Sequence, residues 1–444
     1  MSQEDIPAPD SSAPVRARRR WLRPLLTTLS TLVIAAIVFA WWSKSRPDFE
    51  YGPLMESPRR DFTATAIDEQ HLLVVGGEDE KGNVLATWEL FDATKMAFTK
   101  KGALPHPVMD HTATYDQFTG KIIIAGGWDG ARVSDDIFLF DTQTSQITSG
   151  PKLHFPRRCA VAVGIGEGPY SGAVLIAGGA DRECGFELYH TSTGEVAYRE
   201  GPGGTLRGAT LSYVLLKEQY LLAGGRSADG RVSDHAWLVD PGTMNAKPTG
   251  PMKTARYGQC STGDTDWQGS LLAGGIAADG TALSSTEYYE GYKGAFEYGP
   301  QLPVRLFNGS AAAYLSSNMV IDWRTMWGRI ICGGTPGRPS PRTEVLWPDA
   351  NGRLRFDKGP RLRTARYGAK IGWFKLGTRD ICIVLGGKTR DAHATATVEI
   401  ADSKQFYIRR HRLENAWLKV YDLIGNTIRR WRGQPPVVRS NLNM

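Results

Sequence analysis

Residues that carry enzyme chemistry are scarce in this chain. It has 444 residues but only 8 histidines and 5 cysteines, and no two histidines show a convincing metal-ligand spacing. The Gly-x-Ser-x-Gly turn that holds a nucleophilic serine is missing. Gly387-Lys388-Thr389 imitates the end of a phosphate loop, but Cys382 stands where that loop requires glycine. The sequence therefore predicts no catalytic residue, no metal and no cofactor.

Excess basic charge is absent from the central part of the chain. The formal net charge is +7, of which residues 1–24 contribute +2 and residues 405–444 contribute +6, so residues 25–404 sum to −1. The high isoelectric point thus belongs to the two tails, and a nucleic-acid partner is not indicated. The basic tail, 413–444, fits either a membrane-surface contact or a solvated segment.

One apolar run stands out near the N-terminus, Leu25–Trp42. It has no charged residue, and its length of 18 residues is about the minimum for a membrane span. Arginines precede it, and only Lys44 and Arg46 follow closely, which places the N-terminus in the cytoplasm. The alternative is a signal peptide cleaved after Ala40. Either way we expect the rest of the chain to be exported, into the periplasm if the source is a Gram-negative bacterium.

A helical period is also missing, and glycine doublets recur in its place. They follow apolar runs such as KIIIA (Lys121–Ala125) and lie 46 to 59 residues apart. Seven are present: Gly76–Gly77, Gly126–Gly127, Gly178–Gly179, Gly224–Gly225, Gly274–Gly275, Gly333–Gly334 and Gly386–Gly387. A fixed period near 50 residues indicates one supersecondary unit copied along the chain. Each copy reads as four short strands separated by turn residues.

The copies share further sequence signals. Gly-Pro closes most of them, third strands resemble TWELFDA (Thr87–Ala93), and Met252–Gln259 (MKTARYGQ) nearly repeats Arg361–Gly368 (RLRTARYG). From about Asp48 to Arg410 the chain resembles the bacterial kelch repeat. The resemblance implies an all-β, seven-bladed β-propeller. The sixth copy departs from it by an insert, Ser316–Trp327.

The expected domains follow from these segments. They are a cytoplasmic segment (1–24), a membrane anchor (25–42), a linker (43–47), the propeller (48–412) and the tail (413–444). Phe49–Leu54 (FEYGPL) looks like a fourth strand that precedes its first three, so we expect it to close the seventh blade. Gln405–Arg410 (QFYIRR) either competes for that place or adds outside it.

Arginines recur where each first strand begins, which the resemblance places at one mouth of the central channel. Six copies have one there, and Asp110 takes the place in the second copy: Arg60, Arg158, Arg207, Arg256, Arg305 and Arg366. Tyr257 and Tyr367 follow two of them. Guanidinium groups bind carboxylates in a bidentate manner, so we predict an anion-binding mouth. The alternative is that these arginines only bond loop carbonyls.

Loops after the doublets share this face, and Trp128 is the best aromatic candidate for stacking on a sugar or side chain; otherwise it anchors its own loop. Cys159 and Cys184 fall on the same face of one blade, so an exported protein could join them by a disulfide. Cys332 and Cys382 lie inside second strands and are expected to be buried.

The function predicted is recognition without chemistry: a membrane-anchored propeller that holds a protein or glycan partner outside the cytoplasm. Fold alone does not decide this, and two alternatives stand beside it. One is a carbohydrate-active enzyme for an acidic sugar, because galactose oxidase and the sialic-acid mutarotases resemble this scaffold. The other is a structural subunit of an envelope complex.

Overall fold

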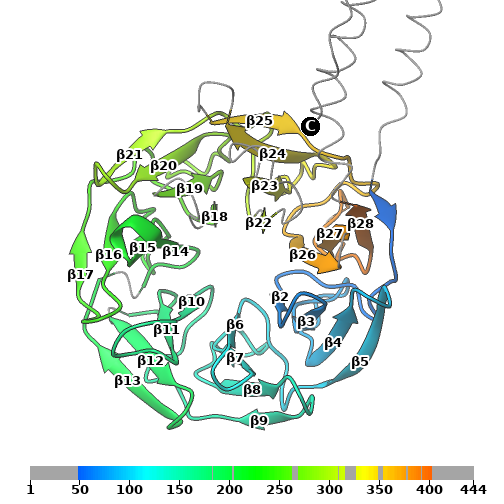
Figure 1. Ribbon diagram of the computed structural model, residues 1–444, viewed down its shortest axis with the longest axis horizontal. Coiled ribbons are helices and arrows are strands. Elements are labelled where there is room, and N and C mark those ends of the chain that lie inside the picture. Colours follow the sequence, from blue (N-terminus) through cyan, green and yellow to red (C-terminus); the bar gives the residue numbers. More distant parts are fainter. Residues whose placement is uncertain are drawn as a thin grey trace, which may run out of the picture. The chain divides into compact units, whose positions relative to one another are not determined.

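Seven four-stranded antiparallel sheets are arranged as blades around a central axis (Figure 1). The computed structural model describes residues 49–402 except 183, 203–204, 263–268, 309, 316–326, 349–353, 377–378 and 392. The predicted segments 1–24, 25–42 and 43–47, the tail 413–444 and most of the insert 316–327 lie outside the described residues. Among the residues described, no helix is long and apolar enough to cross a bilayer.

Each blade runs from an inner to an outer strand. Blade 1 is β2 (Thr63–Ala66), β3 (His71–Val75), β4 (Thr87–Asp92) and β5 (Ala97–Ala103). Blade 2 is β6 (Thr112–Asp116), β7 (Lys121–Ala125), β8 (Ile137–Asp141) and β9 (Ile147–Ser149). Blade 3 is β10 (Val161–Gly164), β11 (Ala173–Ala177), β12 (Phe186–His190) and β13 (Glu195–Arg199). Blade 4 is β14 (Thr210–Val214), β15 (Gln219–Ala223), β16 (Ala236–Val239) and β17 (Ala246–Pro248), with a 3-10 turn η1 (Leu215–Lys217) after β14.

The remaining blades repeat this order. Blade 5 is β18 (Cys260–Thr262), β19 (Gly269–Ala273), β20 (Thr286–Glu290) and β21 (Ala295–Tyr298). Blade 6 is β22 (Ser310–Leu315), β23 (Trp327–Cys332), β24 (Thr343–Pro348) and β25 (Leu354–Lys358). Blade 7 is β26 (Lys370–Leu376), β27 (Arg379–Leu385), β28 (Val398–Asp402) and β1 (Glu50–Tyr51).

Blade 7 closes the ring with a strand from the start of the propeller. Glu50 pairs with Ile400 and Tyr51 with Glu399, and the adjoining Phe49 is fully buried beside Cys382 and Val384. The predicted closure by the Phe49 strand is thus confirmed. QFYIRR lies outside the described residues.

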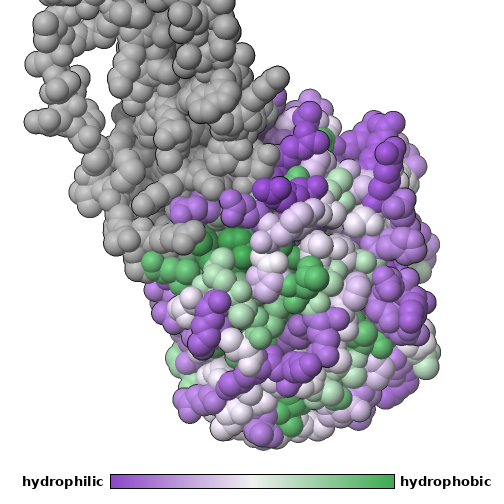
Figure 2. Space-filling model, turned by 90° about the vertical axis from the view of Figure 1, so that its right-hand side faces the viewer, coloured by the Kyte–Doolittle hydropathy of each residue, from purple (hydrophilic) through white to green (hydrophobic). Residues whose placement is uncertain are grey.

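The second strand of a blade is apolar because it is covered on both faces. In β7 the last four residues are all buried, and the blade 1 and blade 2 side chains Leu73, Trp88 and Phe140 belong to one core cluster. The core therefore lies between adjacent blades. The outer strands face water: β5 is half-buried or exposed throughout, and the side of the ring where blades 1 and 7 meet shows hydrophilic and hydrophobic residues interspersed (Figure 2).

The doublets end the second strands where two backbones approach closely. Gly127 has a φ of +103°, and a Cβ there would lie 2.6 Å from Cγ2 of Val108 and 2.7 Å from the carbonyl oxygen of Met109. Only glycine both adopts this positive φ readily and leaves room for the neighbouring backbone, because it has no Cβ. The doublets are therefore structural.

Candidate functional site

Two successive positions precede each inner strand, and they have different surroundings. The first position is buried, and its arginines, Arg59, Arg157, Arg256 and Arg366, are all 0% exposed. The second position lies beside the channel and holds, among others, Arg60, Arg158, Arg207, Tyr257 and Tyr367. The single arginine ring of the sequence analysis is therefore wrong for Arg256 and Arg366, which belong to the buried position.

The buried arginines bind their own blade. In blade 5 the guanidinium of Arg256 donates to Oε1 of Glu287 at 2.6 Å and to the carbonyl oxygen of Gly274 at 2.9 Å. Arg366 makes the equivalent bonds to Glu399 and Gly386. Burial lowers the pKa of Arg256, and the charge of Glu287 opposes this effect. These side chains stabilise the blade and are not available to a ligand.

Two blades replace the whole ion pair by apolar residues. Strand register places Phe138 of blade 2 and Trp237 of blade 4 at the position of Glu89. The partner position, held by Arg59 in blade 1, is Val108 or Leu206 in these blades. Blades 2 and 4 thus lack both members of the pair, whereas blade 6 has Leu306 at the arginine position and keeps Glu344, which is 3% exposed.

The residue that follows the two positions adopts a left-handed backbone in every blade. Glycine supplies it in three blades, but the others use Asp61, Asp110, Cys159 and Asn308, with φ between +46° and +54°. These seven residues form an inner belt: Asp61, Asp110, Cys159, Gly208, Gly258, Asn308 and Gly368. The amide of Asp110 donates to the carbonyl of Asp61 at 2.9 Å, and four similar bonds continue the belt to Asn308. A non-glycine residue here costs about 1 kcal/mol.

The inner belt surrounds a cavity of about 620 Å³ at the channel mouth. All seven belt residues line it, and so do four basic side chains: Arg158, Arg207, Arg226 and Lys370. Asp61 and Asp110 are the acidic lining residues. The cavity has the size of a small-molecule site, and basic residues outnumber acidic ones.

Three predicted mouth arginines are neutralised by carboxylates. Arg60 contacts Asp61 at 2.7 Å and also Glu78. Arg158 donates to Oδ2 of Asp110 through Nε at 2.8 Å.

Arg207 pairs with Asp181. These carboxylates offset the positive charge of the three arginines and occupy some of their hydrogen-bond donors. The arginines therefore attract an anionic ligand less strongly.

Two other cations have no carboxylate partner among the described residues. Lys370 begins β26, where the inner strands of the other blades begin with threonine, valine, cysteine or serine. Arg226 follows the blade 4 doublet, donates to the carbonyl of Gly230 at 3.1 Å, and lies 5.6 Å from the centre of the Tyr257 ring. The sequence analysis expected the loops after the doublets, one of which carries Arg226, on this face, but it missed Lys370. Alignment of the seven strand starts would have revealed the lysine.

Asp110 is the acidic counterpart of these cations. Burial and the charge of Asp61 raise the pKa of Asp110, while Arg158 opposes the shift. Two adjacent carboxylates, and two cations that have no carboxylate partner in the described part of the chain, give the mouth hydrogen-bonding groups of both signs. Among the described residues, no cluster of three or more His, Cys, Asp or Glu side chains could hold a metal ion.

His111 joins blades 1 and 2 beneath the belt. It is 7% exposed, and Nε2 lies 2.8 Å from Oγ1 of Thr63. Burial, with a smaller contribution from Lys370, lowers the pKa of His111 to about 3. Gln259 occupies the same position in blade 5 and reaches Oγ1 of Thr210. His111 therefore links blades in its neutral form.

The His111→Gln variant should lose part of the acid sensitivity of the protein. Below the unfolded pKa of 6.5, the unfolded histidine gains a proton that the folded one does not, so stability falls as pH falls. Between pH 8 and pH 5 the histidine accounts for about 2 kcal/mol of this loss. Urea unfolding at both pH values measures it, and an unchanged difference between them in the variant would contradict the assignment.

Trp128 and Arg305 lie away from the cavity lining. The guanidinium of Arg158 lies 5.3 Å from the centre of the Trp128 ring, so this indole supports a mouth arginine. Arg305 is exposed and precedes the belt residue Asn308 by three positions. Neither one lines the mouth.

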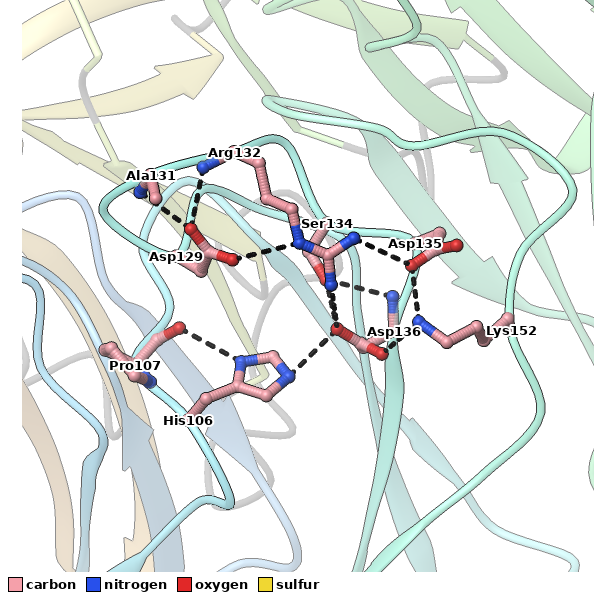
Figure 3. A network of polar contacts seen from close by, with 9 residues as sticks. All are labelled: His106, Pro107, Asp129, Ala131, Arg132, Ser134, Asp135, Asp136 and Lys152. Atoms are coloured by element: carbon pink, nitrogen blue, oxygen red, sulfur yellow. Dashed lines mark hydrogen bonds and ion pairs between the residues drawn. The ribbon is translucent and has the colours of Figure 1, made fainter.

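The loop that carries Trp128 is held by a polar network (Figure 3). Asp136 accepts hydrogen bonds from Lys152 and Ser134, both at 2.7 Å, and contacts Nε2 of His106 at 2.9 Å. Burial raises the pKa of Asp136, but these bonds outweigh it and bring the pKa below its ordinary value. Asp129 accepts from the amides of Ala131 and Arg132. The network fixes the loop.

The disulfide that Cys159 and Cys184 could have formed is not present. Cys159 precedes β10 and lines the mouth, whereas Cys184 is buried before β12. Because β11 lies between these strands, the two residues are separated by two strand spacings, about 10 Å, beyond the reach of a disulfide. Burial raises the pKa of the Cys159 thiol to about 12. Cys332 and Cys382 are buried in β23 and β27, as predicted.

Comparison with known proteins gives a partial match. No family model matches the chain. Beta-scruin of Limulus polyphemus is 27% identical over 149 residues, which is 32% of this chain and 15% of the relative. The match thus spans a small part of the relative's length. Together with the seven four-stranded blades, it supports a kelch-type propeller.

Proposed function

We propose that this chain is a membrane-anchored recognition protein. Its propeller lies outside the cytoplasm and binds a protein partner at the channel mouth. Kelch-type propellers commonly mediate protein binding, and the apolar run Leu25–Trp42 with its flanking arginines supports the anchor. The propeller supplies binding and no chemistry.

The cavity at the mouth carries the proposal. Lys370 and Arg226 line it and have no carboxylate partner among the described residues. At the first position of the inner strand, the six other blades have threonine, valine, cysteine or serine where blade 7 has Lys370. Because those blades fold without a lysine there, the fold does not require Lys370. A carboxylate of the partner would supply the missing charge-assisted bonds. The binding determinant is therefore an anionic group that enters the mouth.

Photocrosslinking of the full-length protein in its own membrane tests this. A photoreactive residue at Tyr257, beside the mouth, should capture a partner, and one at Tyr298, on the outer strand of the same blade, should not. Tyr298 is 67% exposed and serves as the matched control. The double variant Lys370→Thr/Arg226→Ala uses residues found at these positions in other blades, so it should fold normally and lose the crosslink.

Two outcomes would contradict the proposal. Capture from Tyr298 alone would favour a structural subunit that binds through the sides of its blades. Retention of the Tyr257 crosslink in the double variant would show that the two cations do not bind the partner.

A further inference from the structure

One third-strand position, the one that pairs with the residue two before the glycine doublet, differs in burial between blades. In six blades this residue is 4% exposed or less: Glu89, Phe138, Glu187, Glu287, Glu344 and Glu399. In blade 4 it is Trp237, which is half-buried. Because the fold buries this position elsewhere, the exposure of Trp237 needs a local cause.

Comparison with blade 2 identifies that cause. Both blades lack the ion pair, but in blade 2 the ring of His106 packs on Phe138 at 4.8 Å between centroids. Asp136 holds that histidine at 2.9 Å (Figure 3). The ring near Trp237 is that of His235, 5.8 Å away, with a side chain that is 70% exposed. Trp237 therefore has no comparable cover among the described residues.

A cavity of about 640 Å³ lies against this indole. Leu206 and Trp237 give it an apolar surface, while Thr205, Ser233 and Asp234 add hydroxyl and carboxylate groups. The cavity adjoins the channel mouth, because Ser227 and Ala228 line both. Arg207 lines the mouth and Asp181 lines this cavity, and the ion pair between them stands at the boundary.

The charges of this cavity are largely satisfied by the protein. Asp229 is bonded to Arg231 at 2.5 Å and Asp181 to Arg207. The guanidinium of Arg182 lies 4.6 Å from the centre of the Phe155 ring. An ionic ligand would have to compete with these contacts, whereas a neutral ligand with hydroxyl groups would not. The cavity volume is that of a small-molecule site.

We propose that Trp237 is the stacking platform of a binding site for a neutral sugar unit. The apolar face of a pyranose ring would lie on the indole, whose face carries partial negative charge and attracts the C–H groups of the sugar. The sugar hydroxyls would bond to Asp234, Ser233 and Thr205 at the rim. This site is additional to the mouth and does not depend on Lys370, which lines the mouth and not this cavity.

Saturation-transfer NMR on the full-length protein tests the site with methyl glycosides of glucose, galactose, mannose and N-acetylglucosamine. At about 50 mM a site of millimolar Kd is nearly saturated, and at least one glycoside should show transfer. Trp237→Leu should weaken its binding about 10-fold, and Asp234→Ala, which leaves the indole in place, should weaken it several-fold. Lys370→Thr, which changes a residue of the mouth and none of this cavity, should bind the glycoside normally.

Trp237→Phe is the folding control, because blade 2 already has phenylalanine at this position. It should melt like the wild type and keep part of the affinity. The proposal is overturned if no glycoside shows transfer. It is equally overturned if transfer survives unchanged in both Trp237→Leu and Asp234→Ala, or if tetramethylammonium displaces the glycosides, since the site would then select cations.

Discussion

The Arg256→Val variant should lose about 3–5 kcal/mol of unfolding free energy, because Glu287 would remain as a buried charge without its partner. Arg256 and Glu287 are both 0% exposed and are bonded at 2.6 Å. Glu287 also accepts a hydrogen bond from the amide of Lys253 at 2.7 Å, which keeps the carboxylate in place. Urea unfolding of the full-length protein measures the loss.

A second substitution should recover part of this stability. Glu287→Phe added to Arg256→Val reproduces the Val108 and Phe138 combination of blade 2, so the double variant should be about 2 kcal/mol more stable than the single one. Recovery stays incomplete because the Lys253 amide loses its acceptor.

Arg305→Ala is the control for this pair, since an exposed arginine should change stability by less than about 0.5 kcal/mol. A double variant less stable than Arg256→Val would show that the valine–phenylalanine pair of blade 2 cannot replace the arginine–glutamate pair of blade 5.

The Phe49→Ala variant tests closure of the ring. Phe49 is 0% exposed, its amide donates to the carbonyl of Arg361 at 3.0 Å, and it belongs to the core cluster between blades 6 and 7. Loss of a buried phenylalanine costs about 3–5 kcal/mol, and here it also loosens the strand that joins the last blade to the first. Thermal and urea unfolding of the full-length protein should both show the loss.

Tyr51→Ala is the matched control for the ring closure. Tyr51 lies in β1, two residues after Phe49, but is 58% exposed, so its loss should cost about 1 kcal/mol or less. Equal effects of the two variants would mean that the Phe49 strand is not needed to hold the ring together.

The architecture could be predicted from the sequence because glycine doublets mark one point of every blade. Gly76–Gly77 and its six counterparts end second strands, where the close approach of backbones admits no other residue. Ring closure was readable for a similar reason: Phe49–Leu54 is a fourth strand that has no first three strands before it. Both inferences rest on local signals that the fold imposes in each copy.

The site was harder to predict because arginine occurs at two adjacent positions. Arg59-Arg60 and Arg157-Arg158 fill both positions, so an alignment on arginine alone combines a buried ring with a channel ring. An alignment on the left-handed residue separates them, since Gly258 and Gly368 are then equivalent to Asp61. The exposure of Trp237 follows from which side chains cover it, and this depends on packing between neighbouring segments that no linear pattern records.

The pairing of Glu50 with Ile400 sets a condition on how the chain folds. These residues are 350 positions apart, so the strand that is synthesised first has no partner until blade 7 has been made. At about 5–20 residues per second, translation of the intervening chain takes roughly 20–70 s. During that time one edge of the growing propeller stays open, and an open strand edge is a site of aggregation. Completion of the ring is therefore a late event in folding, and contacts of such long range are formed slowly.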